Sequence, residues 1–240
     1  MTTDQAAGHD VDLPDDEAAP TGRSSRTVLL VRLALAGVLF LIVAAVAGFL
    51  IAAPDTPADD SVAAGLARDM IDHHAQAVDM ATIVRGRTQD DAIRFLTTDI
   101  ALTQTSQMGQ MQGWLDVWGL SLGRTGKPMA WMTANDHGMQ MGTGTTMDPS
   151  MMRLQANGLM PGMATQEQVN QLRTLPPAQA DVRFLQLMIA HHRGGVAMAQ
   201  TAIEETKEPV VIRLCQTIVK GQQLEITQMT QLLAERGAKP

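Results

Sequence analysis

Several features that would decide the class of a protein are missing from this 240-residue chain. Cys215 is its one cysteine, so an intrachain disulfide is impossible. No stretch alternates apolar and polar residues as a half-buried strand does, so no β-sheet is predicted. Acidic residues outnumber basic ones, 25 to 18, which disfavours a nucleic-acid partner. No nucleophile, base and orienting group can be assembled from the sequence, so an enzyme is not predicted.

What the chain does have near its N-terminus is a long apolar run. Leu33 to Ala53 carries no charge and has the roughly 20 residues that a helix needs to cross a bilayer. Arginines precede the run and aspartates follow it, which places the N-terminus in the cytoplasm. A cleaved signal peptide is the alternative, but the run is longer than a usual signal sequence and Pro54 would obstruct cleavage. We predict an uncleaved single-pass anchor over residues 26–53 in the cell membrane, with the C-terminal part extracytoplasmic.

The regions on either side of the anchor differ in composition. Residues 1–25 are acidic and lack apolar periodicity, which predicts a disordered cytoplasmic tail. Beyond the anchor, apolar residues recur at helical spacing. They predict four helices, at about Ser61–Arg85, Asp90–Trp118, Pro177–Thr206 and from Glu208 to just before Gly237.

The two predicted helix pairs are copies of one another. "MIDHHAQAVDMA" at residues 70–81 returns as "MIAHHRGGVAMA" at residues 188–199, displaced by 118 positions. The second helix of each pair matches at the same displacement. The sequence therefore predicts an all-α four-helix bundle, one domain over residues 61–237, built from the duplicated pairs 61–119 and 177–237.

A different kind of segment joins the copies. Residues 120–176 form a predicted connecting loop rich in methionine and glycine. Thr165 and Gln168 resemble a capping box and predict a short helix there. The methionines and His137 of the loop could supply soft ligands, or the loop could be a docking surface.

The paired histidines point inward on the predicted helices. At about 100° per residue, His73 and His74 fall on the apolar stripe of their helix, as do His191 and His192. The opposite face holds acids that we expect in solvent: Asp69, Asp72 and Asp79. On the second helix of each pair, Gln107 and Glu225 are equivalent inward positions.

Inward histidines have a structural and a metal-binding interpretation. A buried histidine bonded to a Gln or Glu is ordinary core chemistry, and methionine at helical spacing usually packs. Four such histidines flanked by methionine at matched offsets favour a metal site, and imidazole with thioether favours copper, Cu(I) above all. A di-iron site would need Glu-x-x-His motifs, which are absent. The candidate ligands are His73, His74, His191, His192, Met70, Met80, Met188, Met198, Met111, Met229, Glu225, His137, Met139 and Met141.

These residues resemble a known family, the bacterial envelope proteins with domain of unknown function 305. The resemblance rests on the two histidine motifs, "HGM" at 137–139, "MPGM" at 160–163 and "QQLEITQM" at 222–229. It implies a ferritin-like helical bundle and, from some members, extracytoplasmic copper binding with the four paired histidines as principal ligands. Gln107 departs from the family, which favours Glu there, so the first copy is expected to bind metal more weakly.

Two functions follow as hypotheses. The first is a membrane-anchored protein that binds and buffers copper through His and Met. The second is a non-catalytic helical subunit or docking protein of a membrane complex, in which the histidines are structural. Its partners would be a membrane protein or further copies of the chain.

Overall fold

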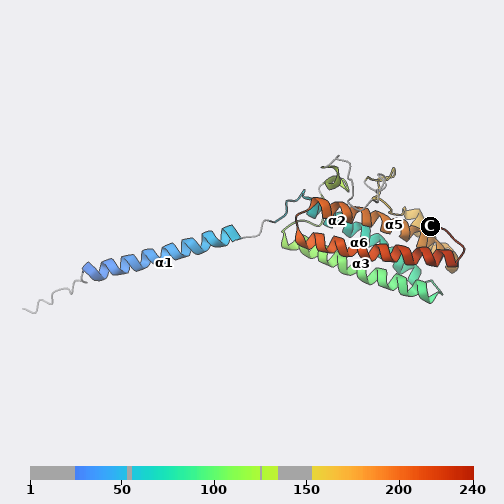
Figure 1. Ribbon diagram of the computed structural model, residues 1–240, viewed down its shortest axis with the longest axis horizontal. Helices are drawn as coiled ribbons and strands as arrows, with labels where there is room; N and C mark the ends of the chain where they lie inside the picture. The colour runs from blue at the N-terminus through green and yellow to red at the C-terminus, as the bar shows by residue number, and fades with distance from the viewer. Residues whose placement is uncertain (1–24, 53–55, 125, 135–152) are drawn as a thin grey trace, which may run out of the picture. The chain divides into compact units, whose positions relative to one another are not determined.

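A computed structural model describes residues 25–52, 56–124, 126–134 and 153–240 (Figure 1). These residues form six α-helices and one 3-10 helix, and none of them lies in a strand, which confirms the all-α prediction. The chain divides into two compact units, Met1–Asp55 and Thr56–Pro240. Nearly all of the predicted cytoplasmic tail falls outside the described residues.

The first unit contains one helix, α1 (Ser25–Ala52). From Ser25 to Gly48 it is long and apolar enough to cross a membrane. It begins before the apolar run because Arg26 and Arg32 are good helix formers that extend it toward the N-terminus. The helix over the predicted anchor is therefore confirmed.

The second unit contains the four predicted long helices. They are α2 (Val62–Arg85), α3 (Asp91–Val117), α5 (Pro177–Glu205) and α6 (Pro209–Glu235). The Ser61 side chain caps α2 by accepting the N–H of Ala64, while α5 and α6 begin with proline, which suits a first helical turn. These local signals explain why the predicted ends agree with the structure to within a residue or two.

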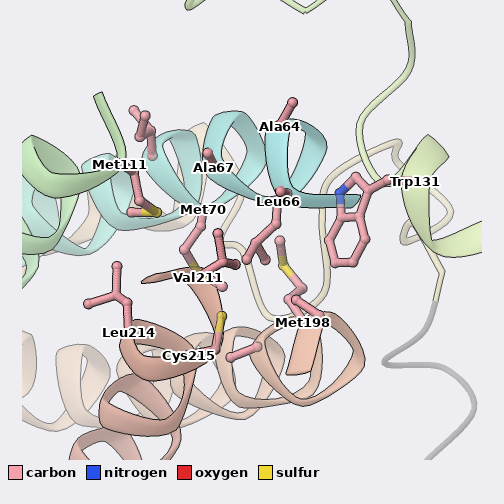
Figure 2. Packing of buried hydrophobic residues seen from close by; sticks show 14 of the residues in the cluster. Ala64, Leu66, Ala67, Met70, Met111, Trp131, Met198, Val211, Leu214 and Cys215 are labelled. Carbon is pink, nitrogen blue, oxygen red and sulfur yellow. The ribbon is translucent and has the colours of Figure 1, made fainter. Parts of the chain in front are cut away.

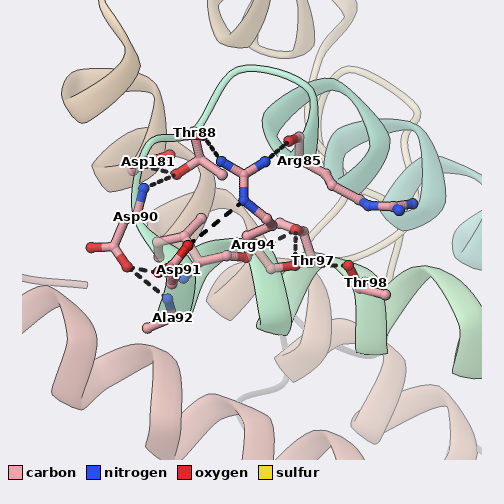
Figure 3. Close-up of polar contacts among 10 residues, drawn as sticks. Arg85, Thr88, Asp90, Asp91, Ala92, Arg94, Thr97, Thr98 and Asp181 are labelled. Atoms are coloured by element: carbon pink, nitrogen blue, oxygen red, sulfur yellow. Dashed lines mark hydrogen bonds and ion pairs between the residues drawn. The ribbon is translucent and has the colours of Figure 1, made fainter.

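The turn between α2 and α3 is fixed by polar contacts (Figure 3). The guanidinium of Arg94 donates to the backbone carbonyls of Arg85 and Thr88, at 3.2 and 2.6 Å. Asp90 caps the start of α3, and the hydroxyl of Thr88 donates to Asp181 on α5. The first helix pair is thereby joined to the second at this end of the bundle.

Each pair packs as a hairpin, α2 on α3 and α5 on α6, and the hairpins meet where α2 contacts α5. Two apolar clusters form the core. One, the first methionine cluster, contains Met70, Met111 and Met198 (Figure 2), and the other, the second methionine cluster, contains Met80, Met188 and Met229. The early methionine of α2 thus shares a cluster with the late methionine of α5, so the two helices run antiparallel. The displacement of 118 positions converts one cluster into the other.

The described parts of the connecting segment pack on the bundle. They include η1 (Ala130–Ala134) and α4 (Gln166–Thr174), and α4 starts with the predicted capping box of Thr165 and Gln168. α4 contacts both α2 and α5, and η1 contacts α2.

One prediction about α2 was wrong, because Asp69 is buried rather than in solvent. It is 2% exposed and accepts hydrogen bonds from the Met129 N–H at 2.6 Å and the Trp131 indole N–H at 2.8 Å. Arg124 lies 3.0 Å from its other oxygen. The connecting segment covers this part of α2, a tertiary contact that helical periodicity does not encode. Asp72 and Asp79 do lie at the surface.

Candidate metal centre

The four paired histidines occupy the middle of the bundle, two on α2 and two on α5. All four are fully buried, as predicted from their helix faces. The rings of His73 and His191 contact each other across the α2–α5 contact, with their centroids 3.8 Å apart and their planes tilted by 34°. Gly195, near the histidines of α5 in sequence, instead faces α6, because a Cβ added to it would lie 2.7 Å from Gln222 Oε1.

Every one of these rings has an oxygen acceptor at Nε2. Two acceptors are backbone carbonyls and two are side chains of α3 and α6. The pairs are His73 with Pro161 O at 3.1 Å, His191 with His73 O at 2.9 Å, His74 with Gln107 Oε1 at 2.7 Å and His192 with Glu225 Oε2 at 2.5 Å. Because these oxygens accept the hydrogen bond, Nε2 carries the proton in each ring.

The other ring nitrogen, Nδ1, is buried in all four histidines and has no hydrogen-bond partner among the described residues. Burial lowers the pKa of His73 to about 4 and of His74 to about 3, and it holds that of His191 well below the usual 6.5. At neutral pH these three rings are therefore uncharged. Each has a lone pair on Nδ1 that nothing in the described structure satisfies, and a buried acceptor without a partner is costly.

The predicted methionine ligands lie on both sides of the histidines. Met70, Met80, Met188, Met198, Met111 and Met229 are all buried. Met70 lies one helical turn from His73 and His74, and Met188 stands in the same relation to the histidines of α5. Each methionine cluster therefore brings thioether sulfur to within a turn or two of the histidine layer.

The rings do not form a ready cage for a metal. In the described part of the chain, no three His, Cys, Asp or Glu side chains come together in an arrangement that could hold an ion. A metal held in this conformation would have fewer than three imidazole ligands, and the buried methionines are the soft groups that remain to complete its coordination. Such a low-coordinate, uncharged set of soft and borderline ligands suits Cu(I) better than Mg, Ca or Mn.

Several polar groups of this layer were not predicted as site residues. Gln104 and Gln222, equivalent in the two copies, are 2% and 4% exposed, and neither amide has a partner among the described residues. Their lack of partners depends on tertiary packing, which helical periodicity does not encode. The Pro161 carbonyl belongs to the "MPGM" motif, whose sequence gave no sign of its bond to His73.

The remaining candidate ligands stand in different positions. Glu225 meets His192, as the predicted second helix face required, and its side chain is 15% exposed. His137, Met139 and Met141 lie outside the described residues, so their role stays a prediction.

Comparisons with known proteins agree with this architecture. The family described as "Domain of unknown function (DUF305)" matches residues 64–233. A DUF305 protein of known structure from Streptomyces coelicolor is 46% identical, covers 76% of this chain and 98% of its own, and has a TM-score of 0.63. A DUF305 fragment from Deinococcus radiodurans is 34% identical, with coverages of 76% and 99% and a TM-score of 0.57.

A more distant structure shares the fold alone. CopM in its Cu(I)-bound form is 20% identical, covers 71% of this chain and 94% of its own, and has a TM-score of 0.51. Among curated proteins, none matches the chain.

Proposed function

The chain belongs to the DUF305 family, and on this premise we propose that it is a membrane-anchored, extracytoplasmic protein that binds copper and buffers or passes on Cu(I). The observation that carries the proposal is the state of the four buried imidazoles, with Nε2 bonded to oxygen and Nδ1 without a partner in the described residues. Histidines that bind metal through one nitrogen almost always donate the other N–H to a carbonyl or carboxylate. The role is one of binding rather than catalysis.

The ligand types support Cu(I) over harder cations. Neutral imidazole and thioether are soft to borderline ligands, and six buried methionines flank the rings. Of the residues that accept hydrogen bonds from the rings, Glu225 alone has a carboxylate, so little negative charge is available for a divalent ion. CopM was solved with Cu(I) bound, but CopM resembles this chain in fold alone. The choice of copper therefore depends on the residues of this chain.

The anchoring part of the proposal is supported by α1 and its flanking charges. Arg23, Arg26 and Arg32 precede the apolar run, and Asp55 follows it. The protein should fractionate with membranes, and protease added outside the cell should remove the bundle. Recovery of a mature N-terminus beyond Ala53 would replace the anchor with a cleaved signal peptide.

The competing hypothesis is the non-catalytic subunit with structural histidines. The Nε2 hydrogen bonds alone would suit that role, because they tie α2 and α5 to α3, α6 and the Pro161 loop. It gives no account of the four Nδ1 atoms that have no partner among the described residues.

Metal analysis of the full-length protein in detergent separates the two hypotheses. After anaerobic loading with Cu(I) and washing, elemental analysis should find retained copper, and X-ray absorption should find nitrogen and sulfur ligands. The double variant His191→Gln, His192→Gln should retain less copper while keeping its helical circular dichroism. Wild-type protein that retains no copper, or binds it through oxygen alone, would refute the proposal.

A further inference from the structure

A groove of about 610 Å³ runs between α3 and α6. The other neighbouring helices of the bundle pack extensively, α2 on α3, α5 on α6 and α2 on α5, whereas α3 and α6 do not. The groove has apolar and polar walls, which include Leu102, Ser106, Gln107 and Trp114 from α3 and Arg213 and Thr217 from α6.

Gln107 connects this groove with the histidine layer. Its side chain lines the groove and also accepts the hydrogen bond from His74 Nε2 at 2.7 Å. One turn earlier on α3, the buried amide of Gln104 has no partner among the described residues. A cation that leaves water needs replacement ligands at each step. Gln107 lies between the groove and the His74 ring, and Gln104 offers a second buried amide one turn away on the same helix.

The opposite side of the histidines is closed by backbone. A Cβ atom added to Gly194 would lie 2.0 Å from the Pro161 carbonyl oxygen, and one added to Gly162 would lie 2.1 Å from the Ala190 carbonyl oxygen. Gly162 also has a φ of +73°, which favours glycine. The loop therefore touches α5 with no room for even a methyl group, and passage there would require the backbone to separate.

We propose that the groove between α3 and α6 is the route by which metal reaches the histidine layer, with Gln107 and Gln104 as the groups that it passes. Movement along this route requires rotation of side chains, whereas the loop side requires backbone displacement. The inference rests on the proposed copper-binding function. It adds groove-lining residues, Ser106, Arg213 and Thr217, that control the rate of loading but not the final affinity.

The charge of Arg213 should make the rate of metal loading through the groove depend on ionic strength. It is exposed on α6 and lines the groove, so its positive charge opposes the approach of a free cation. Charges near a binding cleft change association rates more than equilibrium affinities, and their effect falls with ionic strength.

Filling the groove tests the route. The double variant Ser106→Trp, Thr217→Trp places an indole on each wall. The matched control is Thr105→Trp, Gln216→Trp, which alters the adjacent residues, both exposed and outside the groove lining. Full-length protein in detergent is mixed without oxygen with Cu(I) as its cationic acetonitrile complex, and unbound ion is trapped at set times with a chromophoric chelator.

The groove variant should load at least tenfold more slowly than the control, with an unchanged dissociation constant. In case the indoles disturb folding, Arg213→Glu provides a second readout. It should load several-fold faster than wild type at low salt, and Arg85→Glu, at the end of α2, should not. Loading of both groove variants at the rates of their controls would overturn the route while leaving copper binding intact. Failure of wild type to bind copper would instead remove the proposed function.

Discussion

In the first copy of the helix pair His74 donates to the amide of Gln107, whereas in the second copy His192, at the equivalent position, donates to the carboxylate of Glu225. The distances are 2.7 and 2.5 Å, so the duplication has kept the geometry and changed the chemistry of the acceptor. A carboxylate makes an imidazole a more basic ligand than an amide does. We therefore expect the second copy to bind metal more tightly than the first.

The copies also differ in what covers them. On α2, Asp69 and Gln76 bind the connecting segment, through Trp131 and Ala164 among others. The equivalent residues of α5 are Leu187 and Gly194, which form no such hydrogen bonds with side chains. The connecting segment is therefore held to α2 of the first copy by hydrogen bonds, whereas it contacts α5 of the second copy by close van der Waals packing at Gly194.

A third difference between the copies is a cysteine on α6 where α3 has a threonine. Cys215 lies in the first methionine cluster, at the position where the first copy has Thr97. Burial raises the pKa of the Cys215 thiol to about 12, so the residue is an uncharged core side chain at neutral pH. Thr97 instead donates its hydroxyl to the Ile93 carbonyl.

The largest expected effect is loss of stability in acid. The folded pKa values of His73, His74 and His191 lie below the unfolded value of 6.5, so below pH 6.5 the unfolded chain takes up protons that the folded chain cannot. As the pH falls below 6.5, each ring lowers the free energy of unfolding by about 1.4 kcal/mol per pH unit until its folded pKa is reached. Denaturation at pH 7.5, 6 and 5 should show stability that is complete above pH 6.5 and falls by several kcal/mol toward pH 4. Replacing His74 by Gln should make this dependence shallower; an unaltered slope would mean that the ring is not held neutral.

The next largest effect tests the close packing of the connecting segment against Gly194 of the second copy. Gly194→Ala should destabilise the bundle by about 3 kcal/mol, because the new methyl group meets the Pro161 carbonyl. Gly221→Ala on α6, where an added Cβ would meet no described atom within 4 Å beyond the nearby helix backbone, should stabilise it by about 0.5–1 kcal/mol. Chemical denaturation measures both. A Gly194 variant as stable as the Gly221 variant would show that the loop is not seated on α5.

The hydrogen bonds between α2 and the connecting segment are tested by replacing residues of α2 with the residues at the equivalent positions of α5. Asp69→Leu should cost about 2 kcal/mol, because the Met129 and Trp131 N–H groups and Arg124 lose a buried acceptor. Asp72→Ala, which likewise installs the residue of the second copy, should cost less than about 1 kcal/mol, since Asp72 is exposed. Equal losses in thermal or chemical unfolding would contradict the assignment of Asp69 as the main attachment point.

The smallest effect concerns the acceptors themselves. Glu225→Gln should weaken copper binding at the second copy about tenfold, and Gln107→Glu should strengthen it at the first by a similar factor. Chelator competition measures affinity, and thermal melts with and without Cu(I) report the same difference. If both variants give the copper-induced melting shift of wild type, the acceptors are structural only.

The helices and the inward histidines could be predicted because each depends on local sequence. Ser61, Pro177 and the capping box mark helix starts, and the 3.6-residue period places His73 and His74 on the buried face. Because the sequence repeats at a displacement of 118 positions, the same argument predicts that His191 and His192 are buried as well.

The surroundings of the histidines could not be predicted in the same way. Burial of Asp69 results from a segment some 60 residues later in the chain that folds back on α2, and the bond from His73 to Pro161 spans 88 residues. The ring contact between His73 and His191 depends on how closely α2 and α5 approach. Such contacts are set by tertiary packing, on which helical periodicity is silent.

The central claim is that the four buried rings keep their protons on Nε2 and offer Nδ1 to the metal. Nitrogen-15 NMR of histidine-labelled full-length protein in detergent tests it directly, with Ag(I) as an air-stable substitute for Cu(I). Without metal, His73, His74 and His191 should show protonated Nε2 and unprotonated Nδ1 at pH 7. On addition of Ag(I), Nδ1 resonances of these rings should shift while the Nε2 protons remain. Metal-induced shifts confined to Nε2, or to histidines other than these four, would contradict the account.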